Sequence, residues 1–469
     1  METYQIDSSL AKRIQQELGQ NVFLCYQCVK CTSGCPLVDY FDWQPNQIMR
    51  AAQLGQEDIA LQSDTIWLCA ACQTCTTRCP QGLDIAAIMD MLTRQAAAAG
   101  LEPSIPEVNI FNQAFMREVR LWGRAYELGL LAEMKLRTGN FTQDLDLGAK
   151  MFAKNKLSLF PETGRPKHKV DALKGVEEAV AYYPGCSLHS TAKEFNQSTL
   201  AVCEELGLEL IEPKGWTCCG STAAHRCDPA AAVQLPLGNL SLMEQYGFQQ
   251  VMMPCAACFN RHKVAQYEFD QHPGMRQDLP AHIQHGYQGK IKVNTLLDTL
   301  QEMVGMHRVA GHVKRPLEGL KIVPYYGCLV TRPPDVTGAE HPENPTGMDD
   351  LLAALGAEVV DWSYKTSCCG ASHSLTRPDI VLDLSFNLIE HARESGADMI
   401  AVVCPLCHAN LDARQTQMPV EPPMPVIYIT QLMALAFGLP DEAAALNKNL
   451  IDPRPLLKEK LQAVDQSVV

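Results

Sequence analysis

Two short stretches of this sequence repeat one cysteine frame, which limits what the chain can fold into more than any other feature. They read CYQCVKCTSGCP at residues 25–36 and CAACQTCTTRCP at residues 69–80. In each, four cysteines are separated by two, two and three residues, and a proline follows the last. The chain carries 20 cysteines in all, far more than an ordinary cytoplasmic protein.

Composition indicates a soluble, cytoplasmic protein. No window approaches the ~18 to 20 uninterrupted apolar residues that a membrane span requires, and the first residues predict an amphipathic helix without a secretory signal core. Because disulfides are disfavoured in a reducing cytosol, the cysteines indicate metal binding. The net charge of -14 argues against a nucleic-acid partner. No GxGxxG motif opens a helix in the right context, so we expect no flavin or nicotinamide on this chain.

The repeated frame predicts iron–sulfur clusters. Thiolates are soft ligands that suit iron, and gaps of two residues let a tight loop wrap one cluster, whereas tetrahedral zinc sites usually take two separate CxxC pairs. In the bacterial two-cluster ferredoxin pattern the first three cysteines of a run bind one cluster and the fourth crosses to the other. The frame therefore predicts two [4Fe-4S] cubanes, one held by Cys25, Cys28, Cys31 and Cys79 and the other by Cys69, Cys72, Cys75 and Cys35.

The rest of the chain predicts an α/β architecture with an internal duplication. Residues 111–137 have helical spacing, and from residue 178 strand-like and helix-like segments alternate and then return in the same order. We expect a helical ferredoxin-like domain, a helical segment with a linker, a first and a second duplicated domain, and a C-terminal tail, with bounds of 1–105, 106–177, 178–312, 313–440 and 441–469.

Each duplicated domain supplies five cysteines. They are Cys186, Cys218, Cys219, Cys255 and Cys258 in the first copy and Cys328, Cys368, Cys369, Cys404 and Cys407 in the second. Since a four-iron cubane needs only four thiolates, either one cysteine of each copy is idle or the cluster is not a simple cubane. Adjacent cysteines converge on one site only through a sharp turn, which Gly220 and Gly370 permit.

These spacings resemble a known family. The Cys…CysCysGly…Cys-x2-Cys pattern, present twice, is similar to the paired CCG domains of the heterodisulfide reductase B subunit, and the first 100 residues resemble its C subunit. The order C then B in one chain is similar to the fused D subunit. The resemblance covers most of the chain, apart from residues 101–175 and about the last 25, and all eighteen motif cysteines are present.

The resemblance implies a function and a set of partners. In that family each complete CCG motif binds a noncubane [4Fe-4S] cluster through five cysteines, so the ten cysteines of the two copies would be the ligands of the active-site clusters. A disulfide is cleaved between these clusters, and cubanes feed them electrons. The expected donor is a flavin-containing A-type subunit, with a membrane b-type cytochrome as the alternative. We also expect both doublets, Cys218–Cys219 and Cys368–Cys369, to line one cavity between the copies.

Two other functions are compatible with the sequence. Iron–sulfur subunits of glycolate, lactate and anaerobic glycerol-3-phosphate dehydrogenases, and of some aromatic-ring reductases, look similar and only relay electrons. A zinc scaffold that binds partners is the other. Cys203 and Cys227 lie outside the motifs, and the histidines near the motif cysteines do not occupy matching positions in the two copies, so we assign none of these residues a catalytic role.

Overall fold

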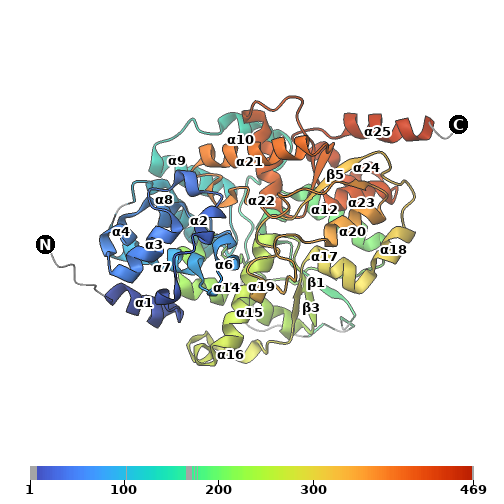
Figure 1. The fold of residues 1–469 in the computed structure, drawn as a ribbon. Helices are drawn as coiled ribbons and strands as arrows, with labels where there is room; N and C mark the ends of the chain where they lie inside the picture. Colours follow the sequence, from blue (N-terminus) through green and yellow to red (C-terminus); the bar gives the residue numbers. More distant parts are fainter. Residues whose placement is uncertain (1–7, 102, 165–171, 174, 177, 467–469) are drawn as a thin grey trace.

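The computed structural model describes residues 8–466 except 102, 165–171, 174 and 177, and it combines an N-terminal helical region with two parallel α/β units (Figure 1). This confirms the predicted α/β class. The described helices include none that is both long and apolar enough to cross a membrane. The N-terminal helices are α1 (Ser9–Leu18), α2 (Lys30–Ser33), α3 (Pro45–Leu54), α4 (Glu57–Gln62), α5 (Asp64–Leu68), α6 (Thr74–Thr77) and α7 (Ile85–Ala98).

The two α/β units have the same topology. The first sheet runs β2-β1-β3-β4 and the second β6-β5-β7-β8, all strands parallel. The strands are β1 (Val180–Tyr182), β2 (Leu210–Ile211), β3 (Gln250–Met252) and β4 (Lys292–Asn294), then β5 (Lys321–Tyr325), β6 (Glu358–Val359), β7 (Met399–Val402) and β8 (Val426–Tyr428). The duplication predicted from the cysteine spacing is thus repeated in strand order.

Helices surround both sheets. In and after the first unit they are α11 (Gly185–His189), α12 (Lys193–Glu205), α13 (Ala224–Cys227), α14 (Pro229–Tyr246), α15 (Ala256–Gln271), α16 (Ala281–Gly286), α17 (Leu296–Thr299) and α18 (Met306–Gly311). In and after the second they are α19 (Pro334–Thr337), α20 (Gly347–Ala354), α21 (Pro378–Glu394), α22 (Pro405–His408), α23 (Ile429–Ala436), α24 (Asp441–Ala444) and α25 (Arg454–Gln466).

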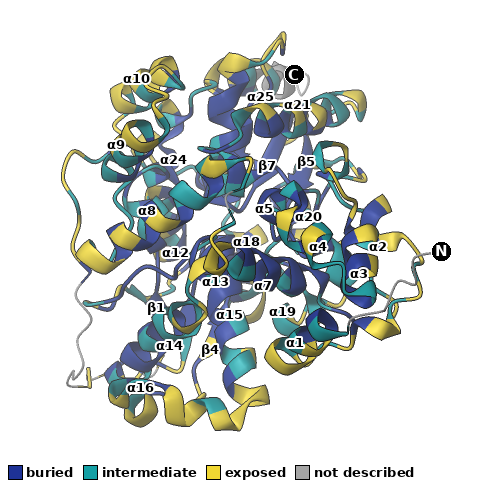
Figure 2. Ribbon diagram, turned by 90° about the vertical axis from the view of Figure 1, so that its left-hand side faces the viewer, coloured by how far each residue is buried: buried dark blue, intermediate teal, exposed yellow. Residues whose placement is uncertain are grey.

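One apolar core runs through both units. The ring of Phe195 on α12 stacks on that of Tyr428 at the end of β8, with centroids 4.2 Å apart and planes 3° from parallel. Because these residues belong to different units, the two sheets share a core, whereas the N-terminal helices pack around a separate one that includes Leu10, Ile48 and Leu92. The buried strands lie inside the molecule in Figure 2.

Three further helices join the N-terminal region to the first unit: α8 (Pro106–Trp122), α9 (Glu127–Thr138) and α10 (Leu145–Ala153). The helix predicted over residues 111–137 is broken at Gly123, which has φ +73°. A Cβ there would lie 1.6 Å from the carbonyl oxygen of Gly164, so this turn requires glycine. The chain reverses at this point, and the Gly123 carbonyl accepts a hydrogen bond from Cys218 N at 2.8 Å.

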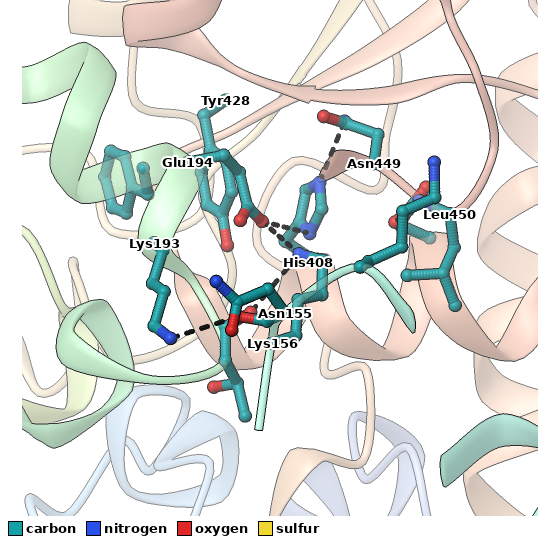
Figure 3. A network of polar contacts seen from close by, with 12 residues as sticks. Asn155, Lys156, Lys193, Glu194, His408, Tyr428, Asn449 and Leu450 are labelled. Carbon is teal, nitrogen blue, oxygen red and sulfur yellow. Dashed lines mark hydrogen bonds and ion pairs between the residues drawn. The ribbon is translucent and has the colours of Figure 1, made fainter. Parts of the chain in front are cut away.

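A buried polar network fastens the residues after α10 to both units (Figure 3). The Lys156 ammonium donates to the Glu194 carboxylate, and both side chains are almost fully buried. Glu194 also lies 4.0 Å from Nδ1 of His408, whose Nε2 contacts Asn449 at 3.3 Å. One set of contacts therefore holds the two units together with residues 156 and 449.

Replacing Lys156 with methionine would leave Glu194 buried without its cation. We expect Lys156→Met to lower the free energy of unfolding by about 3–5 kcal/mol, because a buried carboxylate without a partner loses its hydration uncompensated. The control is Lys150→Met, which removes an exposed pair with Asp146 and should cost at most about 1 kcal/mol. Denaturant titration of the iron-loaded variants measures both, and equal midpoints would contradict the prediction.

Candidate iron–sulfur sites

The motif cysteines of both units follow the carboxyl ends of strands. In the first unit Cys186 comes after β1, the Cys218–Cys219 doublet after β2 and Cys255 after β3. In a parallel sheet of this order these ends meet at one edge, beside the point where the strand order reverses, which is where open α/β sheets bind ligands. Cys328, the Cys368–Cys369 doublet and Cys404 hold the same positions after β5, β6 and β7.

The five thiols of the first unit contact one another in series. Sγ of Cys219 and Sγ of Cys258 are 3.5 Å apart. Hydrogen bonds with Cys186 and Cys219 raise the pKa of Cys218 well above its usual value, and contacts with Cys219 and Cys255 do the same for Cys258. Burial adds to both shifts. The structure thus brings all five predicted residues of this unit to one place.

The second unit repeats this arrangement. Sγ of Cys369 and Sγ of Cys407 are also 3.5 Å apart. A hydrogen bond with Cys328 raises the pKa of Cys368, and hydrogen bonds with Cys369 and Cys404 raise that of Cys407. Asn410 reaches the doublet by donating to the carbonyl of Cys369 at 3.0 Å.

Each unit also holds a glycine and a tyrosine against its thiols. Gly185 (φ +72°) and Gly327 (φ +73°) each precede a motif cysteine, and a Cβ on them would lie 2.7 Å and 2.9 Å from the sulfurs of Cys258 and Cys407. The hydroxyls of Tyr183 and Tyr325 donate to the backbone beside the doublets, at 2.6 Å. These four residues were not predicted, although the repeated letters YYPGC and YYGC carried the signal.

In the N-terminal region the fourth cysteine of each run lies near the other run. The pKa of Cys35 is raised by burial and then by the neighbouring thiols of Cys72 and Cys69. Burial also raises the pKa of Cys75, and Cys69, Cys72 and Cys35 add to that shift. Tyr26, in the first run, has its pKa raised by desolvation and then by both Cys28 and Cys79. This proximity fits the crossed ligand sets, which stay a prediction.

The second run also touches the second α/β unit. The pKa of Cys72 is raised well above normal, first by a hydrogen bond with the thiol of Cys368. Arg332 braces this contact by donating to the hydroxyl of Thr74 at 2.8 Å and to the carbonyl of Thr366 at 3.0 Å. The motifs of the N-terminal region and of the second unit are therefore in direct contact.

The two α/β units meet at their CxxC segments. Hydrogen bonds lower the pKa of Cys404, first from Cys407 and then from backbone groups that include Ala256 of the first unit. Ala256 directly follows Cys255, and the pKa of buried Tyr428, raised by burial, is raised further by both Cys404 and Cys255. Thiols thus follow one another from the N-terminal region through the second unit to the first.

The histidines near the motifs make structural contacts. His225 binds Asp90 of the N-terminal region, Nδ1 to Oδ2 at 2.7 Å, and Nε2 of His373 lies 2.8 Å from the carbonyl oxygen of Leu68. Both tie the N-terminal region to an α/β unit. The two cysteines outside the motifs have pKa values raised by burial, to about 12 for Cys203 and about 11 for Cys227.

A cavity of about 640 Å³ opens onto the first unit. All five of its motif cysteines line this cavity, together with residues of α8, α9 and α10. Of the described residues that line it, none is a motif cysteine of the second unit. The expectation that Cys368 and Cys369 share the cavity with Cys218 and Cys219 is therefore wrong, since Cys368 faces Cys72 of the N-terminal region instead.

The donor set fits iron–sulfur clusters. All 20 cysteines are free thiols, and the motif cysteines are grouped as soft ligands in fours and fives. Within the described chain no three cysteine, histidine or acidic side chains are arranged to hold a single metal ion. When bound, such clusters supply one-electron carriers.

Family models match both parts of the chain. A 4Fe-4S dicluster domain matches residues 24–84, and a cysteine-rich domain matches twice, at residues 180–261 and 322–412. The matched ranges contain the two N-terminal runs and all ten motif cysteines of the α/β units.

Comparison with whole proteins gives the same result as the family models. The 8-methylmenaquinol:fumarate reductase membrane anchor subunit of Wolinella succinogenes is 32% identical over 60% of this chain and 100% of its own length. The B subunit of a ferredoxin:CoB-CoM heterodisulfide reductase from Methanosarcina mazei is 24% identical over 58% of this chain and 93% of its own. The C subunit of a CoB-CoM heterodisulfide,ferredoxin reductase from Methanothermobacter marburgensis is 32% identical over 20% of this chain and 51% of its own.

Together the fold, the thiols and these matches define an iron–sulfur electron-transfer protein with a dicluster domain and two cysteine-rich domains. More particularly, the chain belongs to the family of iron–sulfur proteins related to the B, C and D subunits of heterodisulfide reductase, with C-like and B-like parts joined in one chain.

Crossed ligation predicts which cluster each substitution damages. Cys35→Ser should disturb the cluster of the second run, and Cys79→Ser that of the first, because each residue lies near the other run. Paramagnetic resonance of the reduced variants, resolved by cluster, measures this. Damage confined in each case to the substituted residue's own run would show that the ligands do not cross.

The positive-φ glycines predict selective loss of iron. Gly185→Ala places a methyl group against the sulfur of Cys258, so one of four clusters should be lost and iron should fall from about sixteen to about twelve per chain. Gly327→Ala should do the same in the second unit. Gly19→Ala is the control, with a similar φ of +67° and nothing within 4 Å of the added carbon. Iron analysis that gives all three variants the wild-type content would refute this role.

Proposed function

We propose that this chain is a heterodisulfide reductase-like oxidoreductase subunit. It passes electrons from a flavoprotein partner through two cubanes to two noncubane [4Fe-4S] clusters of the CCG domains, where a disulfide is reduced. The observation that carries the proposal is the series of contacts from the N-terminal runs through Cys72 and Cys368 to Cys404 and the first unit. Such a series keeps successive clusters close together, with no solvent-exposed gap between them.

The cluster ligands in this proposal are those expected from the sequence. Cys25, Cys28, Cys31 and Cys79 hold one cubane, and Cys69, Cys72, Cys75 and Cys35 the other. The five cysteines of each α/β unit hold its noncubane cluster. Contact among the five thiols of each unit supports this assignment, because a fifth cysteine left idle would have no reason to adjoin the other four.

An exposed apolar patch supports a protein donor. Phe23, Leu24, Tyr26 and Val29 are 42–61% exposed and flank Cys28, itself exposed, in the sequence. Apolar residues gathered beside an exposed ligand are typical of a protein interface rather than of free surface. We assign this patch to the flavin-containing A-type subunit or another redox subunit, with a membrane cytochrome as the alternative. Association with a membrane would then come through that partner.

The Wolinella relative favours a second function. Its name describes a subunit of a fumarate reductase, which acts on a substrate other than a disulfide. By analogy, this chain would relay electrons within a dehydrogenase or reductase complex whose chemistry takes place elsewhere. The same four clusters serve both functions, so the iron content does not distinguish them. A content of about eight irons per chain would instead mean that the chain holds only the two cubanes.

Direct binding of a thiol separates the two functions. If the disulfide is reduced on this chain, adding thiols or candidate disulfides to the oxidised protein should produce a new cluster-centred paramagnetic signal, which broadens when the substrate sulfur carries a magnetic isotope. Cys219→Ser should abolish the signal while the cubanes still accept electrons from dithionite. Cys227→Ser, a substitution outside the motifs, is the control and should retain it. If none of the compounds perturbs a CCG cluster, this chain does not reduce those compounds directly, and the relay function is correct.

A further inference from the structure

The cavity beside the first unit has the size of a ligand site. Its volume of about 640 Å³ falls within the ~300–1,000 Å³ typical of small-molecule sites. All five motif cysteines of the first unit, with Tyr183, form one end of it. The other lining residues come mainly from α8, α9 and α10 and from the second unit around α22. The cluster that these thiols would hold takes up part of this space, and a ligand in the remainder would lie against that cluster.

The walls of the cavity are mainly apolar. Phe111 and Phe115 of α8, Leu128 and Leu131 of α9 and Met151 of α10 all line it. These helices belong to the segment between the dicluster domain and the first cysteine-rich domain, which no family match covers. The shape and polarity of the cavity are therefore set by residues outside the shared motifs.

Of the four charged residues that line the cavity, two form an ion pair and two hydrogen-bond to neutral groups. Arg414 binds Asp144, Nη2 to Oδ2 at 3.0 Å. Lys135 donates to the carbonyl oxygens of Phe141 and Gln143, at 3.1 Å and 2.7 Å, and Glu127 accepts from the hydroxyl of Ser190. Because the walls around these groups are mainly apolar, a charged substrate would lose much of its hydration here, whereas an apolar one would bury its surface favourably.

The mouth of the cavity is also apolar. Leu145 and Phe152 of α10 line it and are 58% and 52% exposed, and nearby Phe141 is 57% exposed. Helices α9 and α10 lie at the periphery of the molecule, with exposed residues along them (Figure 2). The entrance therefore presents apolar side chains to an incoming molecule, as expected for a ligand that is poorly soluble in water.

The second unit has a different setting. Cys368 contacts Cys72 of the N-terminal region, and Cys404 contacts Ala256 of the first unit. Its motif cysteines thus lie between the dicluster domain and the first unit. This is the position of a carrier rather than of a substrate site.

We propose that, within the part of the chain that the structure describes, the first unit is the acceptor site, that its cavity binds an apolar two-electron acceptor, and that the second unit conducts electrons to it. The inference rests on the proposed function, which supplies the electrons from the flavoprotein partner. The acceptor takes up two electrons and two protons, as when a quinone becomes a quinol or a disulfide becomes two thiols. Both head groups have the required chemistry, and the test distinguishes them.

Binding is measured first, by calorimetry on the oxidised, iron-loaded full chain. The apolar probes are duroquinone and dibutyl disulfide, and their charged counterparts are anthraquinone disulfonate and oxidised glutathione. We expect one apolar probe to bind roughly tenfold or more tightly than its counterpart, because the walls of the cavity are mainly apolar. Equal or tighter binding of the charged compounds, or no binding of either apolar probe, would overturn the proposal.

Matched variants on one helix locate the binding site. Leu131→Arg places a charge in the cavity wall and should weaken binding of the apolar probe roughly tenfold or more. Leu136→Arg, on the same helix but 73% exposed and outside the cavity, should leave binding unchanged. Leu131 is half-buried, so the charge should be tolerated in the fold. Equal binding by the two variants would place the probe elsewhere.

Paramagnetic resonance then assigns the unit. The bound probe should shift the cluster signal that is missing from Cys219→Ser and leave unchanged the signal that is missing from Cys369→Ser. A shift of the second unit's signal would overturn the assignment of that unit as a carrier. If the probe binds as described but neither unit accepts electrons from the reduced cubanes, the proposed function fails and the cavity stands as a binding site alone.

Discussion

The rest of the structure depends on holding two sets of five thiols, eight of the ten buried and Cys186 and Cys328 half-buried, close enough to touch. Hydrogen bonds between these thiols, together with burial, raise the pKa values of Cys218, Cys258, Cys368 and Cys407 well above normal, whereas the bonds that Cys219 and Cys404 accept lower theirs. Metal ligands must be deprotonated, so iron binding releases protons and contributes to the stability of the fold. The short parallel strands, the positive-φ glycines and the buried tyrosines all serve to keep these sulfurs in place.

One duplicated unit has acquired two environments. The cysteines, glycines and tyrosines match between the copies, yet Cys368 faces the N-terminal region while its counterpart Cys218 faces α8, α9 and the cavity. The difference arises outside the repeat. A hydrogen bond from Cys218 N to Gly123 fixes the doublet of the first copy against the inserted helices, and Arg332 fixes that of the second copy against Thr74. The two copies therefore differ in the segments that pack against them and not in their motifs.

Much of the fold could be predicted from the sequence, because it depends on local patterns. The alternation of strands and helices and the duplication follow from spacing and periodicity, whereas the convergence of each five-cysteine set was implied by the resemblance to CCG domains. The fourth strands, β4 and β8, are not distinct in the sequence, because a helix follows each of them almost at once. The contact of Cys72 with Cys368 and the walls of the cavity join residues far apart in the chain, and no local pattern reports such pairs.

The contact between Cys72 and Cys368 also constrains how the protein is assembled in the cell. Both sulfurs are nearly inaccessible to solvent, at 9% and 6% residue exposure, and they lie where two parts of the chain close on each other. Iron and sulfide delivered by a scaffold protein would have to arrive while these parts are still apart. Maturation of the N-terminal region is then a step that precedes its docking, and a chain that closes early is trapped without its metal.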